Sequence, residues 1–273
     1  MLLKVKHKTT YRFGSQASYG LKQLRVMPKN RDSQKIHSWD VMLSGAKQQL
    51  SFEDQHHNHV ILASIDEGVH EVVIESAGEI ETKDTSGVIG AHGGHAPLWY
   101  FKRHTQLTKP GRNVAALAAR LPDNDDTLAR MHALSALIRE IVEYQLGATS
   151  VDTTADRAIE IGGGVCQDHT HIMIACARRL GLPARYVSGY LMMNDRIEQE
   201  ASHAWAEVYI EPLGWVGFDV SNGISPDERY VRVATGLDYV EAAPISGVRF
   251  IDTVGKIDGD DGESVLVDVA VQQ

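Results

Sequence analysis

Short runs of apolar residues alternating with polar ones fill the first hundred positions of the chain. The runs LLKVKHKTTYRF, HSWDVMLS, HVILASID and HEVVIESAGEIET are rich in β-branched or aromatic residues and are separated by Gly, Asn, Asp and Ser. Several strands at this spacing predict an antiparallel sandwich or barrel-like domain. The stretch DTSGVIGAHGGHAP, residues 84–97, has no helical period and closes on a proline. We therefore expect a linker there and place the β domain at residues 1–95.

The pattern then changes to the spacing of helices. Apolar residues recur at a helical period at Leu128, Met131, Leu134, Leu137, Ile138 and Ile141. The preceding DNDD segment supplies capping and acidic residues where this helix begins. A later apolar run, residues 172–180, ends in RRLGLP, and this order of basic residues, glycine and proline indicates the end of a helix.

Strand patterns return after that helix. ARYVSGYLM, HAWAEVYIE and GWVGFDV each read as a strand, and the tail from about residue 231 is again strand-like. The sequence therefore predicts an α+β fold: the β domain, and then a core over residues 96–273 in which a helix packs on an antiparallel sheet. We expect the chemistry of the core at residues 160–222 and a β extension at its C-terminus.

Composition and charge narrow the class of protein. The chain has 273 residues, 43% apolar and 23% charged, which is typical of a soluble globular protein. A formal net charge of −9 without a basic cluster argues against nucleic acid as a partner. No apolar run has the length of a signal-peptide core or a membrane span, so we expect no membrane partner and a cytoplasmic location.

The two cysteines, Cys166 and Cys176, are predicted to be free thiols. Within one helix they lie about 15 Å apart along the axis. A disulfide needs Cα atoms within about 7 Å of each other. The pair therefore does not bridge, which fits a reducing compartment.

Cys166 follows GGGV and opens the predicted helix. The positive end of a helix favours a thiolate, and glycines allow a substrate backbone to approach closely. A lone cysteine before an apolar helix is more often a small core residue. Nucleophilic chemistry needs, in addition, a histidine to exchange protons and a group that fixes its tautomer.

His203 and Asp219 supply those two groups. In a strand, His203 shares a face with Trp205, Glu207 and Tyr209, and the opposite face is small and aliphatic, suited to packing against a helix. With an odd-numbered connection through EPLG, Asp219 falls on the same side as His203, a step or two from direct opposition. Alone, such a histidine is usually structural and such an aspartate a turn former; the joint arrangement favours catalysis.

The segments GGGVCQDHTHIMIACARRLGLPARYVSGYL and SHAWAEVYIEPLGWVGFDVSNG, in this order, resemble the transglutaminase-like superfamily, in particular bacterial transglutaminase-like proteins with a β-rich N-terminal domain. The resemblance covers about residues 140–225. It implies a papain-like thiol fold with Cys166 as nucleophile, His203 as general base and acid, and Asp219 as the orienting group. Members are commonly described as predicted cysteine proteases, with other acyl-transfer activities in the wider superfamily.

The chain departs from this pattern at two positions. His169 stands where we expect an aromatic residue, and three residues beyond Cys166 it lies on nearly the same helix face, so it is a weaker rival to His203 as the base. Val220 stands where a proline is usual. Asp168 matches the pattern and is expected to cap the helix or support the site.

Further residues are candidates for supporting roles. Tyr144, Gln145 and Gln167 are candidate donors to the oxyanion that forms on attack, besides the Cys166 N–H. Trp205 and Trp215 are candidate walls of the cleft, with a core role at least as frequent for each.

We expect neither a metal nor another cofactor. His56, His57 and His59 cluster in DQHHNHV, but no cysteine or carboxylate pattern completes a tetrahedral site, and a loop is the better interpretation. HGGH is too rich in glycine to fix ligands. DGDDGE, residues 258–263, lacks the residue order of a calcium loop and reads as a turn.

The leading hypothesis is a thiol-dependent hydrolase or cysteine protease that acts on a peptide or protein substrate through a thioester acyl-enzyme. Transfer of the acyl group to an amine, as in a transglutaminase, shares the first half-reaction and is the alternative. A non-catalytic peptide-binding module is the third possibility; an intact Cys166, His203 and Asp219 set argues against it. The sequence indicates no oligomeric state.

Overall fold

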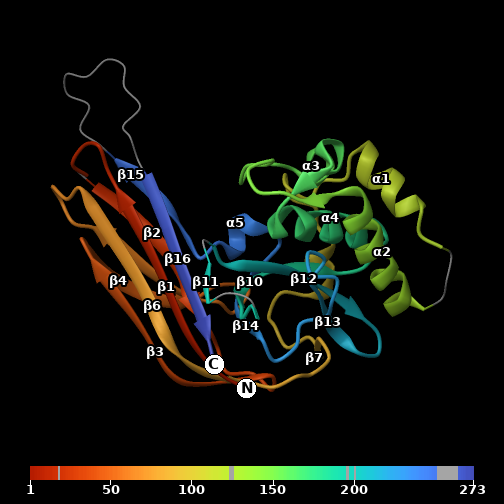
Figure 1. Ribbon diagram of the computed structural model, residues 1–273, viewed down its shortest axis with the longest axis horizontal. Helices are drawn as coiled ribbons and strands as arrows, with labels where there is room; N and C mark the ends of the chain where they lie inside the picture. Colours follow the sequence, from red (N-terminus) through yellow and green to blue (C-terminus); the bar gives the residue numbers. More distant parts are fainter. Residues whose placement is uncertain (18, 123–125, 195–196, 200, 251–263) are drawn as a thin grey trace, which may run out of the picture.

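Two groups of β-strands, one with helices packed on it, meet along a central interface in the computed structural model (Figure 1). The structure describes residues 1–17, 19–122, 126–194, 197–199, 201–250 and 264–273. The predicted α+β class is confirmed. The DGDDGE segment lies outside the described residues, as does most of the DNDD segment.

The N-terminal strands form two antiparallel sheets that face each other as a sandwich. One sheet has the order β11-β16-β1-β6-β3 and the other β15-β2-β5-β4. Their strands are β1 (Leu2–Arg12), β2 (Tyr19–Met27), β3 (Gln34–Ser44), β4 (Ala46–Glu53), β5 (His59–Ile65), β6 (Glu71–Thr82), β11 (Glu198–Gln199), β15 (Ile245–Phe250) and β16 (Ser264–Gln272). Alternating apolar residues such as Leu24, Ile61 and Ile74 fill the space between the sheets.

The C-terminal strands belong to this sandwich and not to the core. β16 pairs with β1 from Lys4↔Gln272 to Arg12↔Ser264, and β15 pairs with β2. We expected the β extension to continue the core, so its assignment to residues 96–273 was wrong for these strands. The physical reason is that β1 and β2 each leave an edge of unpaired backbone groups, which the tail covers. A domain boundary near residue 95 stays a prediction.

The core is a five-stranded sheet with the order β14-β10-β12-β13-β7 and helices packed on one face. Its strands are β7 (Val88–Gly90), β10 (Ala184–Leu191), β12 (His203–Ile210), β13 (Gly214–Phe218) and β14 (Tyr230–Gly236), and β8 (Glu143–Tyr144) pairs in parallel with β9 (Gly163–Gly164) nearby. The helices are η1 (Leu98–Lys102), α1 (Arg112–Ala119), α2 (Thr127–Ile141), α3 (Ala155–Ile161), α4 (Cys166–Arg179) and α5 (Tyr239–Ala242).

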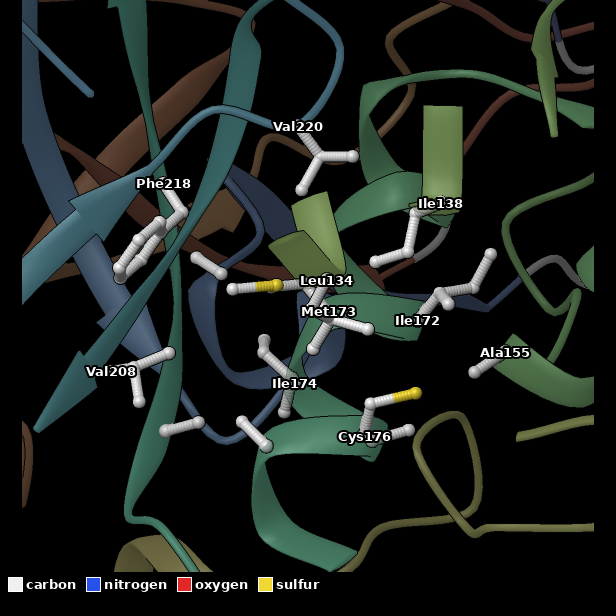
Figure 2. Close-up of a cluster of buried hydrophobic side chains, with 14 of the residues drawn as sticks. Leu134, Ile138, Ala155, Ile172, Met173, Ile174, Cys176, Val208, Phe218 and Val220 are labelled. Carbon is white, nitrogen blue, oxygen red and sulfur yellow. The ribbon is translucent and has the colours of Figure 1, made fainter. Parts of the chain in front are cut away.

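Helix α4 lies at the centre of the core. Its apolar residues, such as Ile172 and Met173, pack between the small aliphatic face of β12 and residues of α2, including Leu134 and Ile138 (Figure 2). The helix ends as predicted, with Arg178 and Arg179 in its last turn and Gly181 at a positive φ. No helix in the described part of the chain combines the length and apolarity needed to cross a membrane.

The expected linker contributes a strand to the core. Residues Val88–Gly90 form β7, which pairs with β13. This strand has only three residues, follows Gly87 and ends at Gly90. It therefore has too few positions to produce a recognisable alternation. The segment between the two domains is therefore partly fixed to the sheet.

Two amide side chains of the β domain cover the outer edge of β14. Gln34 donates to the Arg232 carbonyl at 2.8 Å and accepts the Arg232 N–H at 3.0 Å. Asn58 does the same for Thr235, at 2.7 and 2.8 Å. These amides occupy backbone groups that a neighbouring strand would otherwise bond, and they fix the two domains together.

Candidate active site

Cys166 is the first residue of α4, half-buried at the positive end of the helix. Asp168, in the same turn, accepts the N–H of Val165 at 2.8 Å and the hydroxyl of Thr149 at 2.7 Å. Burial raises the pKa of Asp168 although these donors oppose the shift. Asp168 therefore caps the helix and fixes the loop before it, which is the supporting role expected for it.

The glycines before Cys166 are required by their immediate neighbours. Gly162 has a φ of 74° and caps the end of α3. A Cβ on Gly164 would lie 2.7 Å from Asp168 Oδ2, and one on Gly163 would lie 2.8 Å from Gln145 Oε1. Close packing around the helix start explains these glycines without invoking a substrate.

His203 and Asp219 lie on one face of adjacent strands, as the register argument predicts. The pairing Ala206↔Phe218, continued by one residue, sets Asp219 opposite Trp205 and one same-face step from His203. His203 Nε2 lies 2.6 Å from Asp219 Oδ2. Both side chains are buried, so this contact is protected from water.

Asp219 is held as a carboxylate by two further residues. The Asn222 amide and the Tyr230 hydroxyl each donate to Asp219 Oδ2 at 2.7 Å, and the Asn222 N–H donates to Oδ1 at 3.2 Å. Burial raises the pKa of Asp219, but the charge of His203 and these hydrogen bonds outweigh it, and the net shift is downward.

The His203 imidazole connects this carboxylate to Cys166. Burial lowers the pKa of His203, but Asp219 and a hydrogen bond to the Cys166 sulfur outweigh burial and raise it to about 10. Because Asp219 engages Nε2, the nitrogen left to face the sulfur is Nδ1. A proton can therefore pass between Cys166 and an imidazole whose other nitrogen is fixed.

His169 does not compete for this role. Its Nδ1 lies 2.8 Å from the Ser221 hydroxyl and its Nε2 lies 3.0 Å from the Val142 carbonyl. Burial lowers its pKa, and both ring nitrogens have hydrogen-bond partners. The less favoured alternative, in which His169 is the base, does not fit its contacts, because its side chain is directed to Ser221, in the loop after Asp219, and to the Val142 carbonyl.

The candidate oxyanion donors have different surroundings. The Gln167 amide donates to the Val151 carbonyl at 3.0 Å, which ties it to the preceding loop. Tyr144 is exposed, with its ring 6.2 Å from that of His169. Gln145 is exposed, packs against Gly163, and donates its N–H to the Gly164 carbonyl at 2.8 Å. The Gln145 side chain thus lies beside β9, the strand that leads to Cys166. Among the described residues, its side-chain amide has no hydrogen-bond partner.

The two tryptophans lie in different places. The Trp205 ring is buried with its centroid 6.3 Å from that of His203, and it packs edge-on against Tyr230. Trp215 packs against Phe101 and donates to His92 Nδ1 at 3.2 Å. It pairs with Tyr209, six residues along β12 from His203, and lies in a core cluster with Phe101, so of the two roles considered for it the core role fits and the cleft wall does not.

A second buried carboxylate lies on the same face of β12. Glu207 is fully buried and binds two guanidiniums: Arg185 Nε at 2.5 Å and Arg232 Nε and Nη2 at 2.6 and 3.0 Å. Burial raises the pKa of Glu207, but the two arginines outweigh it and lower the pKa to about 2. The alternation of β12 predicts that Glu207 lies on this face, but nothing in the local sequence indicates its two arginine partners.

The histidine cluster of the N-terminal domain does not form a metal site. His56 bonds Glu241 at 2.7 Å and His57 bonds Glu53 at 3.2 Å. Among the described residues, no group of three or more His, Cys, Asp or Glu side chains is arranged to hold a metal ion.

Two families match the chain. The transglutaminase-like superfamily matches residues 115–220, and the bacterial transglutaminase-like N-terminal region matches residues 3–81. An uncharacterized protein of Mycobacterium leprae is 25% identical over 259 residues, which cover 90% of this chain and 92% of that protein. A protein-glutamine gamma-glutamyltransferase of Pseudomonas aeruginosa is 28% identical over 118 residues, which cover 38% of this chain and 17% of that protein.

One solved structure shares the whole fold. It is described as "a Putative Cysteine Protease" from Cytophaga hutchinsonii, with a TM-score of 0.74, 20% identity, and coverage of 100% of this chain and 98% of that one. The predicted architecture is thereby confirmed: a papain-like, transglutaminase-like core preceded by an antiparallel β domain.

Proposed function

The chain belongs to the transglutaminase-like superfamily, and from that premise we propose that it is a thiol-dependent hydrolase that cleaves amide or peptide bonds. The observation that carries the proposal is the chain of contacts from Cys166 through His203 to Asp219, with the histidine fixed at Nε2 and facing sulfur at Nδ1. The substrate class is a peptide or protein.

The acylation step uses each of the three groups. Nδ1 of His203 takes the proton from the Cys166 thiol, and the sulfur attacks the amide carbonyl carbon to form a tetrahedral oxyanion. The imidazolium then donates the proton to the leaving amine, and the C–N bond breaks to leave a thioester on Cys166. Asp219 stays ionised and stabilises the imidazolium throughout.

The free N–H groups of the first turn of α4 support the oxyanion. The first N–H groups of a helix have no partner within the helix, and they point along its positive end toward the developing charge. Since Cys166 is the first residue of α4, its own N–H is one of them. Gln145 is the side-chain donor that we favour beside it.

Water completes the hydrolysis. His203 takes a proton from a water molecule that attacks the thioester, the carboxylic acid leaves, and the proton returns to the sulfur. An amine in place of water would give transamidation. The likeness to the Pseudomonas aeruginosa glutamyltransferase favours this as the second candidate function.

Selective alkylation tests the thiol chemistry. We expect iodoacetamide to modify Cys166 at slightly acidic pH well ahead of Cys176, because burial raises the pKa of Cys176 to about 12. His203→Ala should slow modification of Cys166 about 100-fold without changing that of Cys176. Peptide mapping by mass spectrometry gives both rates in one sample. Equal, slow labelling of both thiols would contradict the proposal.

Product analysis separates the two outcomes of the thioester. The protein is incubated with mixed peptides, with and without a primary amine, and with Cys166→Ala as the control. Hydrolysis predicts two fragments whether or not the amine is present. A joined product that forms only with the amine and only with Cys166 would identify the acyltransferase instead.

A further inference from the structure

A cavity of about 180 Å³ lies between the β domain and the core, beside the beginning of β12. Its wall on the β domain includes Thr9 of β1 and Val265 and Val267 of β16. Its wall on the core includes Ser202 and Tyr239. In Figure 1, α5 and the start of β12 lie on the side of the core that faces β16 and β1.

The core wall of this cavity is joined to the reactive groups. Ser202 is the residue directly before His203. The Tyr239 N–H donates to Nε2 of His171, in α4, at 3.2 Å. The Tyr239 ring packs against Tyr186 with the centroids 6.2 Å apart. The Tyr186 ring in turn lies 5.2 Å, centroid to centroid, from the ring of His171, in the helix that Cys166 opens. Burial, and then the charge of Cys166, raise the pKa of Tyr186.

The chemistry of the lining is neutral. None of the described residues that line the cavity carries a carboxylate, an ammonium or a guanidinium. The imidazole among them, His7, bonds Tyr190 at 2.9 Å and Thr9 at 3.0 Å, and burial lowers its pKa to about 4. Valine methyls and hydroxyl groups therefore make up most of the surface that an occupant would contact.

We propose that this cavity binds an uncharged side chain of the peptide substrate, next to the amide that Cys166 attacks. The inference rests on the proposed function and names its substrate preference. The volume equals about six water molecules at roughly 30 Å³ each, which suits a side chain such as leucine or glutamine. A charged side chain would lose its hydration there without an ion partner.

The N-terminal domain and the C-terminal strand thereby take part in substrate selection. β1 and β16 come from opposite ends of the chain and pair with each other, with Thr9 opposite Val267. Neither strand contributes Cys166, His203 or Asp219. Changes in these strands are therefore expected to alter which peptides bind while leaving the thiol chemistry intact.

Protection of Cys166 from iodoacetamide measures binding without requiring turnover. Acetylated, amidated pentapeptide mixtures are used, each with one position fixed as Leu, Gln, Lys or Glu. One of the fixed positions should place its side chain in the cavity. For that position, we expect the Leu and Gln sets to protect Cys166 at concentrations at least about 10-fold below those that the Lys and Glu sets require. Equal protection by all sets, or stronger protection by either charged set, would overturn the inference.

A matched pair of variants locates the effect. Val265 and Leu266 are neighbours on β16 with 52% and 53% exposure, and Val265 lines the cavity whereas Leu266 does not. Val265→Trp should fill the cavity and raise the protecting concentration of the uncharged sets about 10-fold. Leu266→Trp should leave the protecting concentration of these sets within about 2-fold of the wild-type value. In the absence of peptide, Leu266→Trp should alkylate at the wild-type rate, and the protecting concentration of each variant is compared with its own rate without peptide.

The two levels of the proposal fail differently. If Val265→Trp and Leu266→Trp behave alike toward the peptides, the cavity does not select a side chain, whatever the thiol does. If the uncharged sets protect and Val265→Trp removes that protection, the cavity assignment stands. A wild-type protein that then yields neither cleaved nor joined peptide would exclude the proposed enzyme activity alone.

Discussion

His203 and Glu207 lie on the same face of β12, four residues apart, and each belongs to a buried cluster built around a carboxylate. The carboxylate beside His203 is Asp219, which accepts from an imidazole, a phenol and an amide. Glu207 accepts from two guanidiniums. One cluster can exchange a proton with Cys166, and the other has donors that stay charged at every physiological pH.

The difference between the clusters shows how one strand serves two purposes. Guanidiniums lower the pKa of Glu207 to about 2, so its charge is constant and its ion pairs join β10, β12 and β14. Asp219 is stabilised first by the charge of His203 and then by the neutral donors Asn222 and Tyr230, so the charge of its cluster depends on the proton of His203. The Glu207 ion pairs therefore hold β12 in place while the His203 imidazole, on the same strand, gains or loses its proton.

The largest expected effect is the loss of stability in Glu207→Gln. Removing the charge leaves two buried guanidiniums without their partner, and the free energy of unfolding should fall by about 3–5 kcal/mol. Denaturant unfolding measures this change, with exposed Glu211→Gln as the control. Because the pKa of Glu207 is lowered from 4.5, its contribution is present above pH 4.5 and is lost as the pH falls toward 2. A Gln variant as stable as the control would show that the ion pairs contribute nothing net.

Asp219→Asn should act on the reaction more than on the fold. We expect kcat/KM to fall about 100-fold, because the imidazolium loses its fixed partner. The charge of Asp219 helps to raise the pKa of His203 to about 10, so wild-type activity should decline as the pH rises through that value. In the variant this alkaline decline should move to lower pH. Identical pH profiles for the wild type and Asp219→Asn would show that Asp219 does not set the pKa of His203. The control is Asp227→Asn, which removes one partner of the Asp227–Arg229 ion pair near the surface.

The raised pKa of His203 also makes the free energy of unfolding depend on pH, in the direction opposite to that expected from Glu207. The pKa of His203 is raised from 6.5, so its contribution to folding is fully present below pH 6.5 and is lost as the pH rises toward 10. Unfolding curves of wild-type protein and Asp219→Asn should therefore converge at alkaline pH.

The smallest expected effect is that of Tyr230→Phe. Loss of the hydroxyl removes one of three donors to Asp219 Oδ2 and should lower kcat/KM about 10-fold, or ~1.4 kcal/mol. The Asp219 pKa should rise with the loss of this donor, so the acidic decline in activity should move to higher pH. Tyr209→Phe, on the far end of β12, is the control. A rate loss with an unchanged pH profile would mean that Tyr230 only packs against Trp205.

The local pattern of the sequence accounts for part of this site. The period of two along HAWAEVYI and the short connection to GWVGFD are enough to bring His203 and Asp219 to one face. Glycine, cysteine and an apolar helical run are enough to set Cys166 at a helix start. These features depend on neighbours within about twenty residues.

The remaining features depend on which strands lie side by side. Tyr230 reaches Asp219 from β14, which pairs with β10 and not with β13, so no spacing in the sequence indicates the contact. Asn222 is different, because it follows Asp219 by only three residues. Asparagine is typical of turns, so the local sequence could have predicted that its side chain lies close to Asp219. Trp215 shares the face of His203, but six residues of strand put roughly 20 Å between them.

The amide contacts of Gln34 and Asn58 on β14 have a consequence for how the molecule behaves in a crowded solution. An open β-strand edge recruits strands from other chains, and natural proteins protect such edges with covering elements. Here the cover is two side chains of another domain, so a variant that loosens them exposes a pairing surface as well as an interface. The same two side chains that join the domains therefore also cover a strand edge that could pair with another chain.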